Sequence, residues 1–312
     1  MGLQAPIVNA PMGGVAGGAL AAAVSLAGGL GMVGIGSAGT PEMLDAELRH
    51  LSALGRPFGI GLVDWVVARN PSLLTAALAA RPALLAVSFG DNLFRDRASW
   101  VASAHDAGVV TAAQVGDLQA AHRAVEAGVD VVIARGAEAG GHGEPRVGTL
   151  PLLAAILDDL AVPVLAAGGV SNGRALAAAL AAGASGGWMG TAFAACTEAL
   201  TPDQARRQLL QARDTDTVVT RVFDVAQDYP WPSELPERVL RNDFADRWAG
   251  REDELAADGE ARAALAEAIA THRHQLAPVN AGQGVGLLTD VRPAAAVINQ
   301  LCSDARRLLD RW

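Results

Sequence analysis

The chain alternates short runs of apolar and β-branched residues with longer stretches rich in alanine and leucine. The short runs have the composition of buried strands, and the longer stretches that of helices covering a sheet. Such alternation is typical of a parallel sheet with both faces covered. Strands are expected over Pro6–Ala10, Gly31–Ile35, Phe58–Val63, Leu84–Ser88, Val109–Gln114, Val129–Ala134, Val162–Ala167 and Gly187–Phe193. Eight units predict an α/β fold, a closed (β/α)8 TIM barrel.

The pattern changes after about position 200. Residues 203–277 are rich in charge and lack strand alternation, with helical stretches expected around Glu237–Trp248 and Glu252–His272. An amphipathic helix from Pro293 to Leu309 ends the chain. We therefore expect a barrel formed by residues 1–202 and 283–312, with a mostly helical insertion or lid over residues 203–282. The aromatic and proline cluster Tyr229–Pro232 suggests a cap over the barrel mouth, with a peripheral helical domain as the alternative.

A doubly wound sheet is the rival architecture. Residues 29–34 and 34–39 both match the G-x-G-x-x-G pattern of dinucleotide-binding turns. That fold also needs an acidic residue about 20 positions later to hold a ribose, and Asp64 is the nearest fit. With 35 glycines in the chain the pattern arises easily, so the count of eight units favours the barrel.

Composition excludes several classes of function. The net charge of −9 argues against nucleic-acid binding, and all 24 basic residues are arginine, which excludes Schiff-base and P-loop lysine chemistry. Two cysteines, Cys196 and Cys302, offer no disulfide framework and no metal cluster. The uncharged first forty residues are broken by Pro11 and many glycines, so no membrane segment is expected. We expect a cytoplasmic protein.

Candidate site residues lie where the predicted strands end, because TIM-barrel active sites form at that edge. They are Ala10, Pro11, Met12, Gly13, Gln114, Arg135, Gly140, Gly141, His142, Gly168, Gly169, Met189, Gly190 and Thr191. The loops after strands seven and eight commonly bind phosphate, and their glycines expose backbone N–H groups. Ser171 is expected to begin a helix whose N-terminus points at the same anion. Tight turns alone are the alternative interpretation of these glycines.

His142 is the candidate catalytic residue. It follows two glycines that let a loop pass close to a flat ligand, and histidine titrates near neutral pH. It can therefore transfer a proton, or it can be a solvated turn residue. The histidines at 105, 122, 272 and 274 fall in charged helical surroundings and are expected to be solvated.

Two further polar residues at strand ends have both structural and functional interpretations. Gln114 needs a hydrogen-bond partner, which a flavin edge or a backbone group would supply. Arg135 could balance negative charge near the N1/O2 edge of a flavin, or pair with Glu138. Glu138 itself is expected to shape the loop.

In order along the chain, Ala10–Gly13, Glu138–His142, Ala167–Val170 and Met189–Thr191 resemble the FMN-dependent nitronate monooxygenases. FMN-dependent enoyl-acyl carrier protein reductases share most of these motifs. The resemblance implies non-covalent FMN, its phosphate at Gly169, Gly190 and Thr191, and His142 as the group that handles the proton of the substrate. It implies O2 and a nitronate or nitroalkane as substrates, without nicotinamide, and leaves a homo-oligomer open.

Two positions depart from the family pattern. Gly61 stands where the family usually has asparagine, and Arg135 where it often has glutamine or aspartate. In the family both positions normally contact the flavin, so the resemblance implies FMN binding but leaves the redox tuning of the flavin and the reaction open. The alternative functions are an NAD(P)H-dependent enoyl-thioester reductase and a flavin-binding protein without efficient turnover. An acidic chain without lysine is a poor docking surface for an acidic carrier protein.

Overall fold

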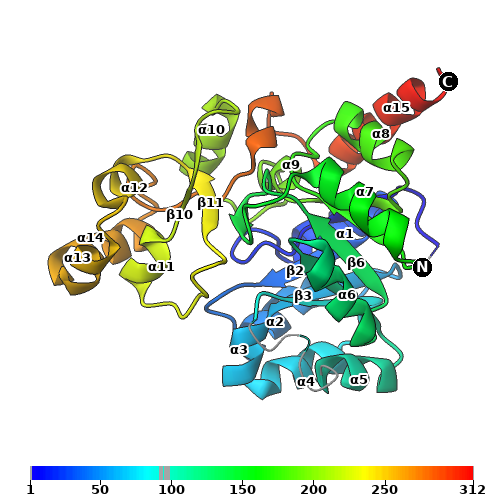
Figure 1. Ribbon diagram of the computed structural model, residues 1–312, viewed down its shortest axis with the longest axis horizontal. Helices are drawn as coiled ribbons and strands as arrows, with labels where there is room; N and C mark the ends of the chain where they lie inside the picture. The colour runs from blue at the N-terminus through cyan, green and yellow to red at the C-terminus, as the bar shows by residue number, and fades with distance from the viewer. Residues whose placement is uncertain (1, 91–93, 95–98, 312) are drawn as a thin grey trace.

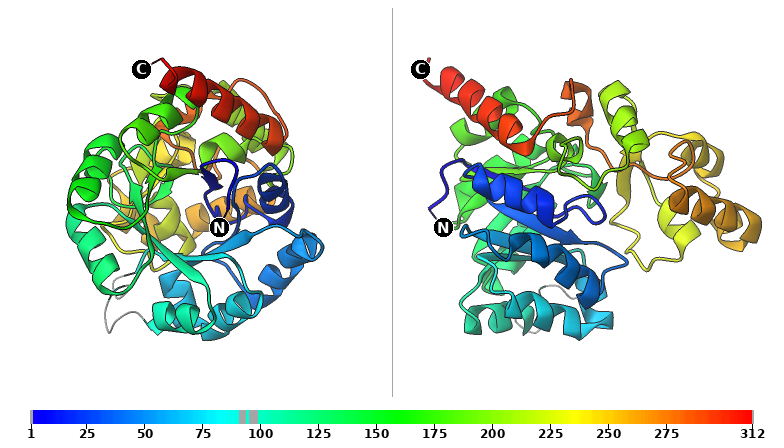
Figure 2. Two further views of the ribbon diagram at one scale, coloured as in Figure 1. Left: turned by 90° about the vertical axis from the view of Figure 1, so that its right-hand side faces the viewer. Right: turned by 180° about the vertical axis from the view of Figure 1, so that it is seen from behind.

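Eight parallel strands form the barrel in the computed structural model, which describes residues 2–90, 94 and 99–311. Their order around the sheet is β1-β9-β8-β6-β5-β4-β3-β2, and flanking helices surround it (Figure 1, Figure 2). The strands are β1 (Ile7–Asn9), β2 (Gly31–Ile35), β3 (Phe58–Val63), β4 (Leu84–Ser88), β5 (Val110–Val115), β6 (Val131–Arg135), β8 (Val164–Ala167) and β9 (Gly186–Met189). The predicted TIM barrel is confirmed.

Asn9 closes the barrel between β1 and β2. Its side-chain Nδ2 donates to the carbonyl of Met32 at 3.0 Å, and its Oδ1 accepts from the N–H of Met32 at 2.8 Å. A parallel bridge between Val8 and Leu30 lies beside these bonds. A buried amide thus continues the ladder where β1 is too short to form it with backbone groups alone.

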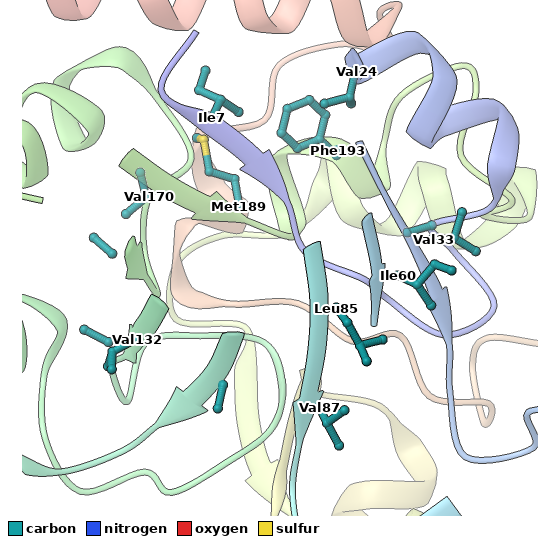
Figure 3. Close-up of a cluster of buried hydrophobic side chains, with 14 of the residues drawn as sticks. Ile7, Val24, Val33, Ile60, Leu85, Val87, Val132, Val170, Met189 and Phe193 are labelled. Atoms are coloured by element: carbon teal, nitrogen blue, oxygen red, sulfur yellow. The ribbon is translucent and has the colours of Figure 1, made fainter. Parts of the chain in front are cut away.

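Alternate residues of each strand pack into two different cores. Side chains such as Ile7, Val33 and Val132 pack outward against the helices (Figure 3). Their neighbours, including Val8 and Met32, belong to a smaller cluster made almost wholly of strand residues, inside the barrel. Because successive strand residues point to opposite faces, both sets must be apolar, which explains the continuous apolar runs in the sequence.

The barrel helices begin at polar residues in several cases. The side chains of Thr40, Asp117 and Asn172 each accept a hydrogen bond from a backbone N–H three residues on. The helix expected at Ser171 therefore has Asn172 as its N-cap. The helices are α1 (Gly18–Leu26), α2 (Pro41–Leu48), α3 (Asp64–Arg69), α4 (Pro71–Ala79), α5 (Ser99–Asp106), α6 (Leu118–Glu126), α7 (Thr149–Asp159), α8 (Gly173–Ala181), α9 (Thr191–Ala194) and α15 (Ala294–Leu309), with 3-10 turns at Arg49–Leu51 and Gln283–Leu287.

The last predicted strand is shorter than expected. Strand β9 ends at Met189, and α9 begins at Thr191, so the second half of the Gly187–Phe193 prediction was wrong. Residues of α9 are as apolar as those of a buried strand, because the helix is itself buried. An apolar run of this length does not distinguish the two structures.

The segment over residues 203–282 stands beside the carboxyl ends of the barrel strands (Figure 1). It contains α10 (Asp203–Gln211), β10 (Thr217–Thr220), α11 (Val222–Gln227), β11 (Glu237–Leu240), α12 (Asp243–Trp248), α13 (Glu252–Ala257) and α14 (Gly259–Ala270). Phe223, Phe244 and Trp248 belong to an apolar core within this segment. We refer to residues 203–282 as the insertion.

The insertion joins the barrel through a small antiparallel sheet that the sequence did not predict. Strand β11 pairs with β10 on one side and, on the other, with β7 (Gly141–His142), which belongs to residues 137–143, here called the glycine loop. The helix predicted from Glu237 was therefore wrong over its first residues, which form β11 instead. In the register, Glu237 lies opposite His142.

Among the described residues, no helix is long and apolar enough to cross a membrane.

Candidate active site

The loop after β1 lies across one side of the barrel mouth. A Cβ at Gly61 on β3 would collide with the Pro11 ring, and a Cβ at Gly13 would collide with the backbone of Gly36. Pro11 therefore occupies the space that a side chain at position 61 would need. This explains the glycine at 61: the loop Ala10–Gly13 packs directly on β3, and an asparagine would fit only if the loop moved.

The loop after β8 has the backbone geometry of an anion cradle. Gly168 has φ of 110° and Gly169 has φ of 68°, values that side chains rarely adopt. A Cβ at Gly169 would meet only the Cβ of Glu138, at 3.6 Å, so the space above this glycine is open. Within the described chain the N–H of Gly169 donates no hydrogen bond. Consecutive left-handed glycines with a free N–H suit a phosphate.

The closing segment, residues 281–284, completes this region and was not among the predicted site residues. The N–H of Gly282 donates to Oγ1 of Thr191 at 3.0 Å, and the N–H of Gln283 donates to the carbonyl of Glu138 at 2.9 Å. A Cβ at Gly284 would collide with Oγ of Ser171. The closing segment thus ties the start of α9 to the glycine loop, and its own glycines were the only signal in the sequence.

Arg135 lies buried at the end of β6, beneath the glycine loop. Its Nη2 donates to the carbonyl of Gly141 at 2.9 Å and, over longer distances, to those of Ala139 and Gly140. Burial, followed by the charge of Arg238, lowers the pKa of Arg135 to about 10, while Glu144 opposes the shift. Over the described ranges no carboxylate forms an ion pair with it. The alternative interpretation of Arg135, an ion pair with Glu138, is therefore wrong.

Glu138 instead shapes the loop, as expected. Its carboxylate accepts from the N–H and Oγ1 of Thr149 at the start of α7, at 3.0 and 2.8 Å.

Arg135 and Gln114 line a pocket of about 720 Å³ at the barrel mouth, together with Glu144. The backbone N–H of Gln114 donates to Ser88 Oγ at 3.1 Å. Its side chain forms no hydrogen bond within the described residues, so a ligand in the pocket could supply one.

His142 lies on β7 and is held from two sides by the insertion. Its Nε2 lies 2.9 and 3.0 Å from the two carboxylate oxygens of Asp224 on α11. Its ring stacks on Trp231, with ring centroids 3.5 Å apart and an interplanar angle of 4°. The His142 side chain is 13% exposed and that of Asp224 5%. The solvated-turn interpretation of His142 is therefore wrong.

Glu237 completes an acidic pair behind His142. Ligand-type atoms of His142, Asp224 and Glu237 all lie within 4.8 Å of one another. Burial, and then the charge of Asp224, raises the pKa of Glu237 well above its usual range. Sequence reasoning missed both carboxylates. They are 82 and 95 positions from His142, and neither lies in a motif.

Trp231 covers the barrel mouth. Its Nε1 donates to Ser37 Oγ, after β2, at 3.2 Å. Its ring meets Trp65 on α3 and Phe89 after β4 edge-on, with centroids 5.7 and 5.5 Å apart. The loop Tyr229–Pro232 thus lies against the carboxyl ends of β2, β3 and β4, as a cap would. That this loop opens and closes as a lid remains a prediction.

The other histidines lie away from this cluster. His105 pairs with Asp130 at 2.9 Å and His122 with Asp159 at 2.6 Å, both at the surface. His274 was expected to be solvated, but it is only 8% exposed. It follows the last helix of the insertion, where the chain turns back towards the barrel, and this packing could not be predicted locally.

The sequence of the chain is similar to those of known enzymes. A family model described as nitronate monooxygenase matches residues 1–72 and 74–304. The nitronate monooxygenase of Pseudomonas aeruginosa is 31% identical, over 98% of this chain and 97% of that protein. A (3aS,4S,5R,7aS)-5-hydroxy-7a-methyl-1-oxo-octahydro-1H-indene-4-carboxyl-CoA dehydrogenase of Rhodococcus jostii is 33% identical over 78% of this chain, which spans 65% of that protein.

Two solved structures are similar over nearly the whole chain. A nitroalkane oxidase from Streptomyces ansochromogenes has a TM-score of 0.82 and 30% identity, covering 99% of this chain and 98% of that one. FabK from Thermotoga maritima has a TM-score of 0.86 and 27% identity, covering 99% of this chain and 95% of that one. The similarity includes the insertion as well as the barrel.

Proposed function

The chain belongs to the nitronate monooxygenase family, and we propose that it oxidises alkyl nitronates with O2 while holding FMN at the barrel mouth. The observation that carries the proposal is the placement of His142. It lies at the carboxyl edge of the barrel, on a loop whose neighbour is the open glycine cradle of Gly168 and Gly169. A proton-transfer group and an anion cradle thus meet at the edge where TIM barrels perform chemistry.

The residues around the cradle fit the phosphate of FMN. The free N–H of Gly169 and the start of α9 at Gly190 and Thr191 would hold the phosphate. Asn172 caps α8 next to this cradle, so the positive end of that helix also favours an anion. The opposite wall is the loop Ala10–Gly13, which packs over β3.

When bound, FMN supplies an acceptor for electrons from the substrate and a route for them to O2. The chain itself has three tasks. The cradle and the β1 loop position the flavin, and Arg135 offers a buried positive charge near Gln114. Trp231 excludes water from one face of His142. His142 accepts a proton when the substrate is a neutral nitroalkane and is not required for that step when it is a nitronate.

Reduction of an enoyl thioester by NAD(P)H is the second candidate, because FabK and the indene-carboxyl-CoA dehydrogenase are among the similar proteins. The charge of the chain argues against an acidic carrier protein as partner. A net charge of −9 without lysine gives little attraction for it. A small nitronate in the capped site needs no such surface.

The proposal is tested by oxygen consumption in the absence of nicotinamide. We expect the purified chain to be yellow, to release FMN on denaturation, and to consume O2 with alkyl nitronates. His142→Ala should retain FMN and lose roughly 10²–10⁴-fold in activity on neutral nitroalkanes, but much less on nitronates. His122→Ala, which removes a surface histidine, is the matched control.

Two results would contradict the proposal. A colourless protein that takes up no added FMN would exclude the cofactor. Equal losses on nitroalkane and nitronate in His142→Ala, with FMN retained, would assign His142 to substrate binding instead of proton transfer.

A further inference from the structure

The environment of His142 distinguishes its two ring nitrogens. Nε2 faces both oxygens of Asp224, whereas Nδ1 forms no hydrogen bond within the part of the chain that the structure describes. Nδ1 is not fully buried, so a ligand can reach it. One nitrogen is thus engaged by the insertion and the other is available to a ligand.

We infer that Asp224 is the positioning residue of His142: its carboxylate accepts a hydrogen bond from Nε2–H and leaves the lone pair of Nδ1 as the base. The inference rests on the proposed function and deepens it. A buried aspartate that orients a histidine and stabilises its imidazolium form is a recurring arrangement in unrelated enzymes. Here the barrel supplies the histidine and the insertion supplies the aspartate, so the base is complete only when the two are docked.

Glu237 is the second carboxylate beside His142, so its environment decides which of the two, Asp224 or Glu237, is ionised. It lies opposite His142 in the β7–β11 register and is 4% exposed, and its carboxylate forms no hydrogen bond within the described ranges. Two buried carboxylates this close do not both ionise readily. Asp224 has His142 as a partner and Glu237 does not, so Asp224 carries the negative charge and Glu237 holds the proton.

The charged side chains nearest to His142, Asp224 and Glu237 on the neighbouring elements are engaged elsewhere. Arg135 lies on the far side of the glycine loop, where a Cβ at Gly143 would collide with its guanidinium group. On α14, Arg262 donates to the carbonyl of Ala226, two residues after Asp224, at 3.1 Å. Asp224 is therefore the only negatively charged group in contact with the His142 ring among the described residues.

The proton balance of the step is simple. The bond between the α-carbon of the nitroalkane and its hydrogen breaks, and the proton moves to Nδ1 of His142. The electron pair of that bond forms the carbon–nitrogen double bond of the nitronate, and the negative charge moves to the nitro oxygens. The imidazolium that results keeps its Nε2–H bond to Asp224, so the new positive charge faces a carboxylate instead of an apolar wall.

The first test reads the tautomer of His142 without any substrate. In protein labelled with ¹⁵N-histidine, we expect Nε2 of neutral His142 to carry the proton and Nδ1 to lack it. Asp224→Asn has the same shape, but its amide can donate to Nε2 and so favours the other tautomer. The His142 signals are identified by their loss in His142→Ala. Asp159→Asn, at the surface pair with His122, is the matched control and should leave His142 unchanged.

The second test is kinetic. Asp224→Asn should lose about 10²–10³-fold in kcat on neutral nitroalkanes while retaining FMN and its circular dichroism spectrum. The acid limb of its pH–rate profile should move to lower pH, because the imidazolium form loses the carboxylate that faces it. Activity on nitronates should fall much less. A substitution that merely loosened the fold would reduce both activities and leave the limb in place.

Three results would overturn the inference. The first is a wild-type His142 with its proton on Nδ1. The second is an Asp224→Asn variant with unchanged tautomer and nitroalkane activity. The third is a tightly bound divalent metal that Asp224→Asn loses, which would make the three side chains a metal site. Because the tautomer is measured without FMN turnover, a protein inactive on nitronates but with the expected tautomer would contradict the proposed function alone.

Discussion

At the scale of single residues, His142, Asp224 and Glu237 lie close together, and the buried Arg135 lies on the other side of the glycine loop. Arg135 donates to backbone carbonyls of the glycine loop instead of pairing with a carboxylate. Asp224 pairs with His142, and the charged neighbour of Glu237 within the described part of the chain is Asp224. Burial penalises the charged form of each group, so partners decide which one stays charged. Glu237, which lacks a partner, is the one whose neutral form is favoured.

This arrangement predicts how the pH dependence of stability changes in Glu237→Gln. The raised pKa of Glu237 means that, above about pH 4.5, the unfolded chain releases this proton while the folded chain retains it. The contribution of Glu237 to the free energy of unfolding is therefore fully present below that pH. It falls as pH rises towards the folded pKa, by up to about 1.4 kcal/mol for each pH unit. Glutamine is neutral throughout and removes this slope.

Urea unfolding of both proteins between pH 4.5 and 8 measures the difference. We expect the variant to gain stability relative to the wild type as pH rises through this range. A difference that stays constant with pH would contradict the protonated state assigned to Glu237. Glu260→Gln, at an exposed position on α14, controls for the substitution itself.

At the scale of elements, the loop after β8 gives a prediction about the cofactor. Gly169→Leu should reduce FMN occupancy strongly, because a side chain there would fill the open space of the cradle. Gly55→Leu is the matched control, since Gly55 also has a left-handed φ of 58° but lies between the 3-10 turn Arg49–Leu51 and β3. Both variants should lose about 1–2 kcal/mol of stability from backbone strain. Full FMN occupancy in Gly169→Leu would place the phosphate elsewhere.

The elements differ in how far the sequence predicts them. Each barrel strand carries its own signal, because apolar residues cover both faces of a buried parallel strand. Strands β10 and β11 carry almost none. Each has four residues, and Glu237 and Arg238 in β11 look like part of a charged helix until the pairing with β7 is known. The pairing is set by tertiary contacts that no local pattern encodes.

The candidate site divides in the same way. Glycines and His142 could be found because they form compact motifs after predicted strands. Asp224, Glu237 and the closing segment could not, because they reach the site from positions 82 or more residues away along the chain. Trp231 falls between the two cases. An aromatic and proline cluster indicated a cap, but its stacking on His142 depends on the fold of the insertion.

At the scale of the whole molecule, the barrel and the insertion each contribute part of the site. The barrel supplies the anion cradle, the β1 loop and the strand end with Arg135. The insertion supplies Asp224, Glu237 and Trp231, and the small sheet β10-β11-β7 joins the two (Figure 1). Arg135 lines the pocket and suits a small anion, whereas a net charge of −9 without lysine is unfavourable for a large acidic partner.

Anaerobic mixing of the FMN-loaded protein with its candidate reductants tests the central claim most directly. We expect an alkyl nitronate to bleach the visible absorbance of FMN rapidly, and NADH or NADPH to leave it unchanged over the same time. Readmitted O2 should restore the absorbance and release nitrite. Bleaching by NADH or NADPH but not by nitronate would contradict nitronate oxidation and establish the reductase alternative.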